Sequence, residues 1–246
     1  MSSILDEVVE VPRRTLVLFF IVDCSGSMAG EKIGEVNYAI QEIIPEIQNI
    51  SENNADAQIK IAVLKFSQGA EWITPVPVNA EDFRWNDLNA YGGTSLGRAC
   101  EMLSAKLSKK EFMSDATGSY APVLFLLSDG IPTDDYDRGL EKLKENKWYK
   151  VAAKVAIAIG GDADKEKLAK FTGNSEMVIT VHTPEALRFW IQFLAVRSSQ
   201  IASKSSNAVS AGNGAMETKQ EQLEKEIRKE KEENGDPSDG EDEWDV

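Results

Sequence analysis

Three short segments carry side-chain oxygens at spacings that could hold a metal ion. The first has Asp23, Ser25 and Ser27 at alternate positions, the second has Thr94 after two glycines, and the third has Asp129. Hard divalent cations such as Mg²⁺ prefer carboxylate and hydroxyl oxygens, and one or two carboxylates are enough to hold them. We therefore predict an incomplete metal site made by these residues, with Mg²⁺ as the expected ion and Mn²⁺ or Ca²⁺ as alternatives.

Each segment also has an ordinary structural interpretation. Asp-x-Ser before a helix is often an N-cap, and Gly-Gly-Thr and Ser-Asp-Gly are common turns. The context favours a site, because the apolar run from Thr15 to Val22 ends directly before Asp23 and the run from Ala121 to Leu127 ends shortly before Asp129. Both runs are typical of buried parallel strands, whose carboxyl ends form the edge where ligands bind.

Strand and helix patterns alternate along the chain. Further strands are predicted at 58–66, 71–74, 151–159 and 177–181, and helices at 31–50, 95–107, around 140–143, at 165–171 and at 184–197. The Ser-Gln-Gly loop before 71–74 indicates an antiparallel hairpin. The predicted fold class is therefore α/β: a three-layer α-β-α, Rossmann-like architecture with a mostly parallel central sheet and one antiparallel edge strand.

Composition and charge narrow the classes of function. The chain has 246 residues and a net charge of −14, without the clustered Lys and Arg that nucleic-acid binding requires. Cys24 and Cys100 are too few for a disulfide scaffold, and His182 stands alone, so we expect free, buried thiols, a structural histidine and no zinc module. No secretory signal or membrane-length apolar run is seen, so we expect a cytoplasmic protein without membrane insertion.

The chain divides into four predicted parts. They are an N-terminal extension at 1–14, the folded domain at 15–197, a Ser-, Ala-, Asn- and Gly-rich linker at 198–215, and an acidic tail at 216–246. In the tail, strong helix formers surround only two apolar anchors, Leu223 and Ile227. We expect a solvated or partner-induced helix there, followed by a disordered acidic end.

Three aromatic residues are candidates for contacts with a partner. Trp85 and Tyr91 come shortly before Thr94 and could rim the binding face, although core packing would explain them as well. Trp244 stands among acids near the C-terminus, where it could serve as a short docking motif or belong to a merely solubilising tail. The acidic tail could also reach a metal site, on its own or a neighbouring copy, and compete with the true partner.

Over about residues 15–197 the chain resembles a von Willebrand factor type A (VWA) domain. That family's metal-ion-dependent adhesion site (MIDAS) is D-x-S-x-S, then Thr, then Asp, and the segments described above supply every element. The phrases VDCSGSMAGEKI, YGGTSLGRA and LLSDGIPTDD most resemble bacterial TerY-like proteins of tellurium-resistance and stress-response gene clusters. The resemblance implies a Mg²⁺ ion whose open coordination position accepts an Asp or Glu from a partner protein. It also implies protein kinases, protein phosphatases or an AAA-type ATPase as partners.

Two functions from different classes follow. The first is a non-enzymatic binding module that recruits an acidic residue of another protein. The alternative is a Mg²⁺-dependent phosphotransferase or phosphatase with Asp23 as nucleophile, because an Asp at the end of the first strand beside Mg²⁺ also serves haloacid-dehalogenase-type phosphatases. Those enzymes resemble D-x-D-x-T at this turn, and here Ser25 replaces the second carboxylate. We therefore expect a protein that is not an enzyme.

Overall fold

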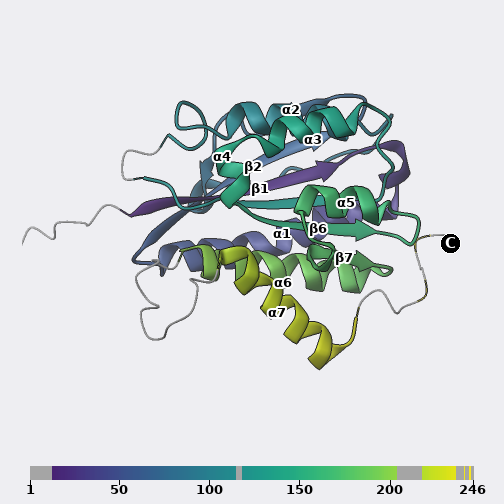
Figure 1. Ribbon diagram of the computed structural model, residues 1–246. Coiled ribbons are helices and arrows are strands. Elements are labelled where there is room, and N and C mark those ends of the chain that lie inside the picture. The colour runs from purple at the N-terminus through teal and green to yellow at the C-terminus, as the bar shows by residue number, and fades with distance from the viewer. Residues whose placement is uncertain (1–12, 115–117, 204–217, 237–240, 242–243, 245–246) are drawn as a thin grey trace, which may run out of the picture.

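A twisted seven-stranded sheet forms the centre of the molecule (Figure 1). The computed structural model describes residues 13–114, 118–203, 218–236, 241 and 244. The parallel strands, in spatial order, are β2 (Ala57–Phe66), β1 (Arg14–Asp23), β5 (Val123–Ser128), β6 (Ala153–Ile159) and β7 (Val178–Val181). Two short strands, β3 (Ala70–Trp72) and β4 (Val78–Asn79), pair antiparallel with β2. The predicted sheet, mostly parallel with an antiparallel edge, is confirmed.

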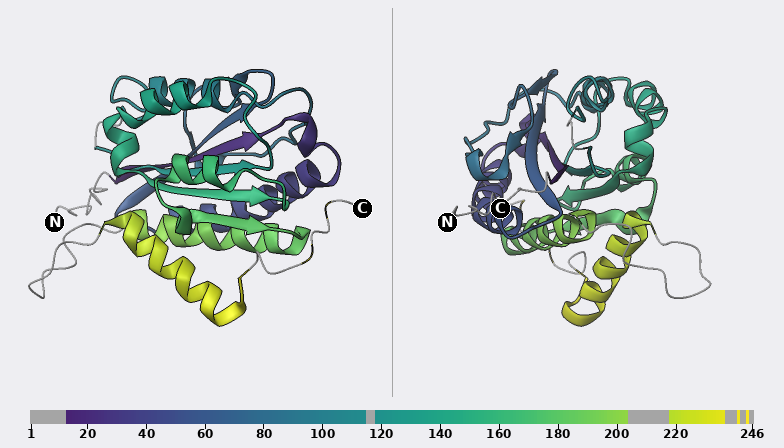
Figure 2. Two further views of the ribbon diagram at one scale, coloured as in Figure 1. Left: turned by 45° about the vertical axis from the view of Figure 1, so that its right-hand side comes forward. Right: turned by 90° about the vertical axis from the view of Figure 1, so that its left-hand side faces the viewer.

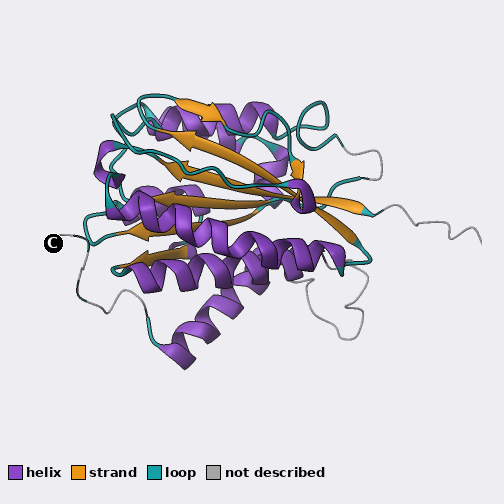
Figure 3. Cartoon of the chain, turned by 180° about the vertical axis from the view of Figure 1, so that it is seen from behind, coloured by secondary structure: helices purple, strands orange, loops and turns teal. Residues whose placement is uncertain are grey.

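Helices cover both faces of this sheet. One face carries α1 (Glu31–Glu52) and α6 (Pro184–Ser203), which lie side by side in Figure 3, with α7 (Lys219–Asn234) outside α6 (Figure 2). The other face carries α2 (Leu96–Lys106), α3 (Tyr136–Lys144), α4 (Lys147–Val151) and α5 (Lys165–Thr172). Short 3-10 turns lie at Gly26–Met28, Ala80–Asp82 and Ser175–Met177. This is the predicted three-layer arrangement.

Strand β1 shows why the sheet must be covered on both sides. Successive side chains of a strand point to opposite faces, and every residue from Leu16 to Val22 is buried. Leu16, Leu18, Phe20 and Val22 pack in the core beneath α1 and α6, whereas Val17, Phe19 and Ile21 pack beneath α2 to α5. A continuous apolar run is the sequence expected for such a strand.

Helix α6 extends beyond the predicted end of the domain at residue 197. It continues to Ser203, and Ser198 and Ser199 are buried within it. The Ser199 hydroxyl donates to the Ala195 carbonyl over 2.6 Å, so the serines satisfy their polar groups within the helix instead of ending it. The rest of the predicted linker, most of the N-terminal extension and much of the acidic end lie outside the described residues.

Helix α7 packs on the domain, whereas the sequence predicts a solvated or partner-induced helix. Leu223 and Ile227 are 0% and 2% exposed and belong to the core beneath α1 and α6. The helix begins with a capping box in which Thr218 and Glu221 exchange hydrogen bonds. Two large apolar side chains one turn apart thus anchor an otherwise charged helix on the domain. Among the helices described, none combines the length and apolar character needed to cross a membrane.

Candidate functional site

The predicted site residues gather at the carboxyl edge of β1 and β5. In the parallel register Val22 lies beside Leu127, so Asp23 and Ser128 end neighbouring strands at the same height. The loop that carries Thr94 is attached by backbone bonds, from Tyr91 N to Cys24 O over 2.8 Å and from Gly26 N to Gly92 O over 2.9 Å. Three loops far apart in sequence thus meet on one edge.

Hydroxyl and carboxylate oxygens form a connected series across this edge. The Ser25 and Ser27 hydroxyl oxygens are 3.1 Å apart, and the Ser27 hydroxyl donates to Asp129 Oδ1 over 2.8 Å. Asp129 and Ser25 are 2% and 1% exposed. The alternate spacing of Ser25 and Ser27 on the turn after β1 is what places both hydroxyls on the side that faces Asp129.

Asp23 lies beneath this series and is fully buried. Its Oδ1 accepts the backbone N–H of Ser25 over 2.8 Å, and its Oδ2 accepts the Ser128 hydroxyl over 2.6 Å. Burial raises the pKa of the Asp23 carboxyl, the hydrogen bonds from Ser128 and Ser25 oppose this shift, and the charge of Asp129 adds a little to it, so that the pKa is raised to about 6. A buried carboxylate held in this way would be stabilised by a nearby cation.

Thr94 is brought to Asp23 by a close approach at Gly130. A Cβ at Gly130 would lie 3.1 Å from the Thr94 hydroxyl oxygen and 3.2 Å from Asp23 Oδ2, so these two oxygens flank the same point. The position of Thr94 is fixed from the loop after β5, since Thr133 N donates to Thr94 O and Thr94 N donates to Thr133 Oγ1, both over 2.9 Å. All five predicted metal-site residues therefore line one edge.

The structure adds two participants that the sequence analysis did not identify. Ser128 bonds Asp23, and Lys32 in α1 forms an ion pair with Asp129, with Nζ 3.0 Å from Oδ2. The position of Ser128 beside Asp129 at the end of a predicted strand was a usable signal. Lys32 carried none, because a lysine in the first turn of an amphipathic helix is usually solvated.

The oxygen atoms at this edge are of the types that a hard divalent cation prefers, but they do not complete its coordination shell. Three neutral hydroxyls and two carboxylates converge, which is the donor chemistry of Mg²⁺ sites that keep some waters. The described residues contain no cluster of three or more His, Cys, Asp or Glu that could hold a metal. A cation here would therefore depend on Ser25, Ser27 and Thr94 as much as on Asp23 and Asp129, and its coordination would need further ligands from outside the chain.

The thiols and the histidine lie where a structural role is expected. Cys24 and Cys100 are free and each 1% exposed. Burial raises the pKa of the Cys24 thiol to about 12, with a contribution from the charge of Asp23, and burial raises that of Cys100 as well. Burial therefore disfavours the thiolate form, which is the nucleophilic form of cysteine, at both positions. His182 is also buried.

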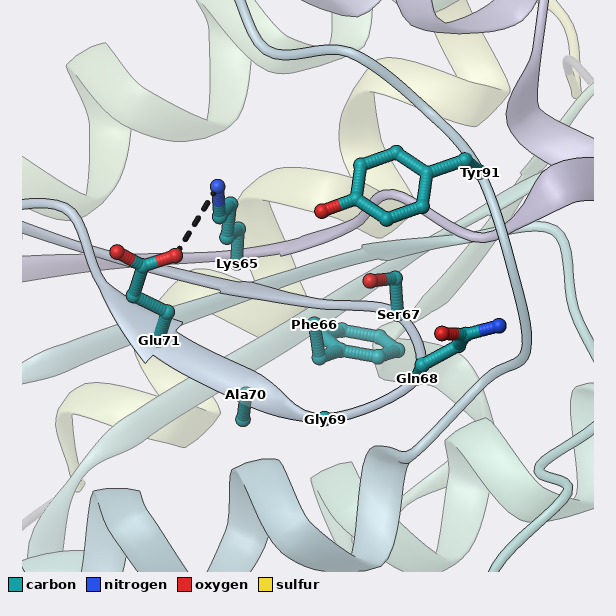
Figure 4. A pocket seen from close by; sticks show the side chains of 8 residues that line it. All are labelled: Lys65, Phe66, Ser67, Gln68, Gly69, Ala70, Glu71 and Tyr91. Carbon is teal, nitrogen blue, oxygen red and sulfur yellow. Dashed lines mark ion pairs between the residues drawn. The ribbon is translucent and has the colours of Figure 1, made fainter.

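The three aromatic candidates lie in different environments. Tyr91 is 59% exposed and lines a pocket of about 310 Å³ with residues of the β2–β3 hairpin, including Ser67 and Gln68 (Figure 4). Trp85 is half-buried against the core, and its indole N–H donates to Asn37 Oδ1 over 3.2 Å. Trp244 packs against the same core, with its N–H directed to the Val181 carbonyl over 3.4 Å. Only Tyr91 of the three is well exposed.

The Tyr91 pocket adjoins the metal-site edge. It is continuous with the β2 end, where Cys24 N donates to Phe66 O and Ser95 N donates to Ser67 O, both over 2.7 Å. Figure 4 shows the tyrosine ring facing the hairpin, together with the ion pair between Lys65 and Glu71, 3.1 Å long. The pocket and the metal-site edge therefore share the backbone at the carboxyl end of β2.

Solved structures share this fold at low sequence identity. One is a von Willebrand factor type A protein from Catenulispora acidiphila, with a TM-score of 0.55, 18% identity, and coverage of 76% of this chain and 43% of that chain. Another is proximal thread matrix protein 1 from the mussel byssus with a zinc-occupied MIDAS motif, with a TM-score of 0.57, 18% identity, and coverage of 75% and 48%. The ArnB paralog VWA2 from Sulfolobus acidocaldarius matches with a TM-score of 0.54, 18% identity, and coverage of 75% and 45%.

These similarities concern the domain and not whole proteins, because the chain spans less than half the length of each of those three structures. Among curated proteins, none matches the chain. The family model of the von Willebrand factor type A domain matches residues 18–192, which include all five predicted metal-site residues. The chain therefore belongs to the von Willebrand factor type A domain family.

Proposed function

We propose that this protein is a non-enzymatic, metal-dependent protein-binding module. Asp23, Ser25, Ser27, Thr94 and Asp129 would form its metal-ion-dependent adhesion site. The observation that carries the proposal is the convergence of three hydroxyls and two carboxylates from three loops on one edge, with the Ser27 hydroxyl 2.8 Å from Asp129 Oδ1. Domains of this family are commonly protein-interaction modules with such sites, which supports the proposal.

The residues have distinct expected roles. Ser25, Ser27 and Thr94 would offer neutral oxygens, and Asp129 would offer a carboxylate. Asp23, whose two oxygens bond Ser25 N and Ser128, would orient the site from beneath. With so few anionic ligands a bound divalent ion keeps residual positive charge, which an Asp or Glu of a partner protein would neutralise. Mg²⁺ is the expected ion, with Mn²⁺ or Ca²⁺ as alternatives.

The arrangement favours binding over phosphoryl transfer. A nucleophilic Asp23 would need a free oxygen directed to the substrate, but both of its oxygens accept hydrogen bonds and the side chain is fully buried. Ser25 stands where haloacid-dehalogenase-type phosphatases would have a second carboxylate. We therefore infer that the protein is not an enzyme.

The finer proposal concerns cellular context and rests on sequence resemblance. Because three phrases around the site resemble TerY-like proteins, we infer a cytoplasmic scaffold or adaptor in a bacterial tellurium-resistance or stress-response system. The expected partners are a protein kinase, a protein phosphatase or an AAA-type ATPase that presents an acidic residue. Tyr91, exposed beside the edge, is the aromatic contact best placed to meet that partner. Trp85 and Trp244 would contribute only after leaving their packing.

A pull-down from native lysate tests the proposal. Wild type, Asp23→Ala and Asp137→Ala are compared with Mg²⁺ and with EDTA. Asp137 is the control because it is an exposed acid that pairs with Lys170 and is not one of the proposed metal ligands. We expect a protein retained by wild type and by the control in Mg²⁺, but lost with EDTA and with Asp23→Ala. Equal retention in all samples would contradict a metal-dependent recruiting surface. Mass spectrometry of the retained protein, with a phosphatase assay in Mg²⁺, tests the finer proposal and the enzymatic alternative.

A further inference from the structure

Lys32 occupies a fixed position beside the proposed metal site. It lies in the first turn of α1, its side chain is only 12% exposed, and its Nζ is 3.0 Å from Asp129 Oδ2, whose side chain is 0% exposed. The other Asp129 oxygen accepts the Ser27 hydroxyl. One of the two carboxylates of the site is therefore already paired with a cation that belongs to the chain.

The loop after β6 lies directly against the ammonium group of Lys32. A Cβ at Gly160 would lie 3.1 Å from Lys32 Nζ, and the positive φ of 90° at Gly160 is unfavourable for other residues. Asp162, further along this loop, has Oδ1 4.0 Å from the same Nζ, and its side chain is 76% exposed. Lys32 thus lies between a buried acid of the site and an exposed acid outside it.

The charges have a direct consequence for metal binding. Asp23 and Asp129 bring two negative charges and Lys32 brings one positive charge, so the ionised site has a formal charge of −1. A divalent cation would change this to +1, and one carboxylate from a partner would return it to zero. Without Lys32 the metal and the two acids would already be neutral, and an incoming carboxylate would gain less from electrostatics.

We propose that Lys32 is a built-in counter-cation that weakens divalent-metal binding and strengthens the demand of the loaded site for a partner carboxylate. The proposal rests on the proposed function, since it concerns the same metal site. It differs from a purely structural ion pair, because a structural pair would change stability without moving metal and carboxylate affinities in opposite directions. Asp162 offers the ammonium a second acid when a metal engages Asp129.

Mn²⁺ titration of the full chain by calorimetry at pH 8 tests this inference. Wild type is compared with Lys32→Met, which keeps the length of the side chain, with Lys32→Arg, which keeps the charge, and with Lys170→Met, which removes an exposed ion pair elsewhere. Even at the dielectric constant of water a unit charge near a divalent ion matters at short range, so we expect Lys32→Met to bind Mn²⁺ about tenfold more tightly. Lys32→Arg and Lys170→Met should match wild type.

The second readout uses acetate as a stand-in for the partner carboxylate. Acetate is titrated into the Mn²⁺-loaded proteins, and its binding is followed by the loss of water-proton relaxation as it displaces metal-bound water. Lys32→Met should bind acetate several-fold more weakly than wild type, by the same charge argument. Unchanged or parallel affinities in Lys32→Met would overturn the inference alone. Failure of wild type to bind Mn²⁺ would overturn the proposed function and the inference with it.

Discussion

The two edges of the sheet both bury charged groups, but they satisfy them in different ways. At the carboxyl edge, Asp23 and Asp129 are surrounded by hydroxyls and one lysine. At the amino edge, Lys154 donates to the Ala152 carbonyl over 2.8 Å, and Lys219 donates to the Ala202 carbonyl and lies 4.6 Å from the Tyr120 ring centroid. Hydroxyl oxygens keep lone pairs that a cation can use, whereas the lysines find their acceptors within the chain.

The two edges therefore have different expected roles: the carboxyl edge would bind a ligand, and the amino edge attaches α7. At the amino edge the Gln220 amide exchanges hydrogen bonds with the backbone of Lys154, over 2.7 and 3.1 Å. Burial lowers the pKa of both Lys154 and Lys219 to about 8. The ammonium groups there are satisfied by carbonyls of the chain, whereas the carboxyl edge is where we propose that a metal ion binds. Changes at the carboxyl edge should therefore alter metal binding, whereas changes at the amino edge should alter stability and leave metal binding unchanged.

The largest difference between the effect on metal binding and the effect on stability is expected for Asp23→Asn. Loss of its charge and of its orienting role should weaken Mn²⁺ binding by about 100-fold. The same change removes a carboxylate that burial penalises, so the metal-free protein should become more stable at pH 7.5, by up to about 3 kcal/mol. Calorimetric titration and denaturant unfolding measure the two effects. Weaker metal binding together with lower stability would mean that Asp23 mainly supports the fold.

At the opposite edge, Leu223→Ala should act on stability alone. Leu223 belongs to α7 and its side chain is fully buried against the domain. Truncation of a buried leucine costs about 2–5 kcal/mol. Urea unfolding should show this loss, while Mn²⁺ affinity stays that of wild type. The exposed neighbour variant Glu226→Ala, which removes only a surface ion pair with Arg197, is the matched control. A drop in Mn²⁺ affinity with Leu223→Ala would show that the packing of α7 is coupled to metal binding, which contradicts the separation of the two edges.

The stability of the metal-free protein and its affinity for Mn²⁺ should change in opposite directions as the pH rises. Because the pKa of Asp23 is raised to about 6 from 3.8, the metal-free native state binds more protons than the unfolded state between these values. Its stability should fall by about 3 kcal/mol from pH 4 to above pH 6, from this group alone. Mn²⁺ affinity should instead rise with pH through 6. Asp23→Asn should remove both trends, and their persistence in that variant would assign them to other groups.

Ser27→Ala should lower metal affinity without a large effect on the fold. It removes one expected ligand and the hydrogen bond to Asp129, so we expect about a tenfold to 100-fold loss of Mn²⁺ affinity. The free energy of unfolding should change by about 1 kcal/mol. Ser67→Ala, in the neighbouring hairpin, provides a control for the loss of a nearby hydroxyl. Unchanged affinity in Ser27→Ala would remove this residue from the site.

The smallest effect is expected for Lys219→Met. Its ammonium contacts one carbonyl and one aromatic ring. The free energy of unfolding should therefore change by about 1 kcal/mol or less. Mn²⁺ affinity should not change, in contrast with Lys32→Met. A shift in metal affinity with Lys219→Met would show that charge anywhere on the domain tunes the site, which the separation of the two edges excludes.

Strand patterns and loop positions were enough to predict the fold and the meeting of the loops that carry the five oxygen-bearing residues, whose role as metal ligands stays a prediction. The buried run before Asp23 and the run before Asp129 predict neighbouring strand ends, and the structure brings those ends to one edge. The meeting of these ends could be predicted because each buried run shows in the sequence where its strand stops, and parallel strands stop at the same edge of a sheet.

Lys32 and α7 could not be predicted in the same way. The burial of Lys32 depends on the loop at Gly160, more than a hundred residues away in sequence. The attachment of α7 depends on a patch of β6 and α6 that accepts Leu223 and Ile227. Composition describes a charged helix correctly but does not show that a complementary surface exists for its two apolar residues.

The most direct test of the metal site is an anomalous difference map from crystals of the full chain grown with MnCl₂. We predict one peak at the carboxyl edge, coordinated by oxygens of Ser25, Ser27 and Thr94, with Asp129 and Asp23 bound directly or through water, and with at least one ligand that is not from the chain. No peak at this edge, or an ion fully enclosed by protein oxygens, would contradict a site that a partner carboxylate completes.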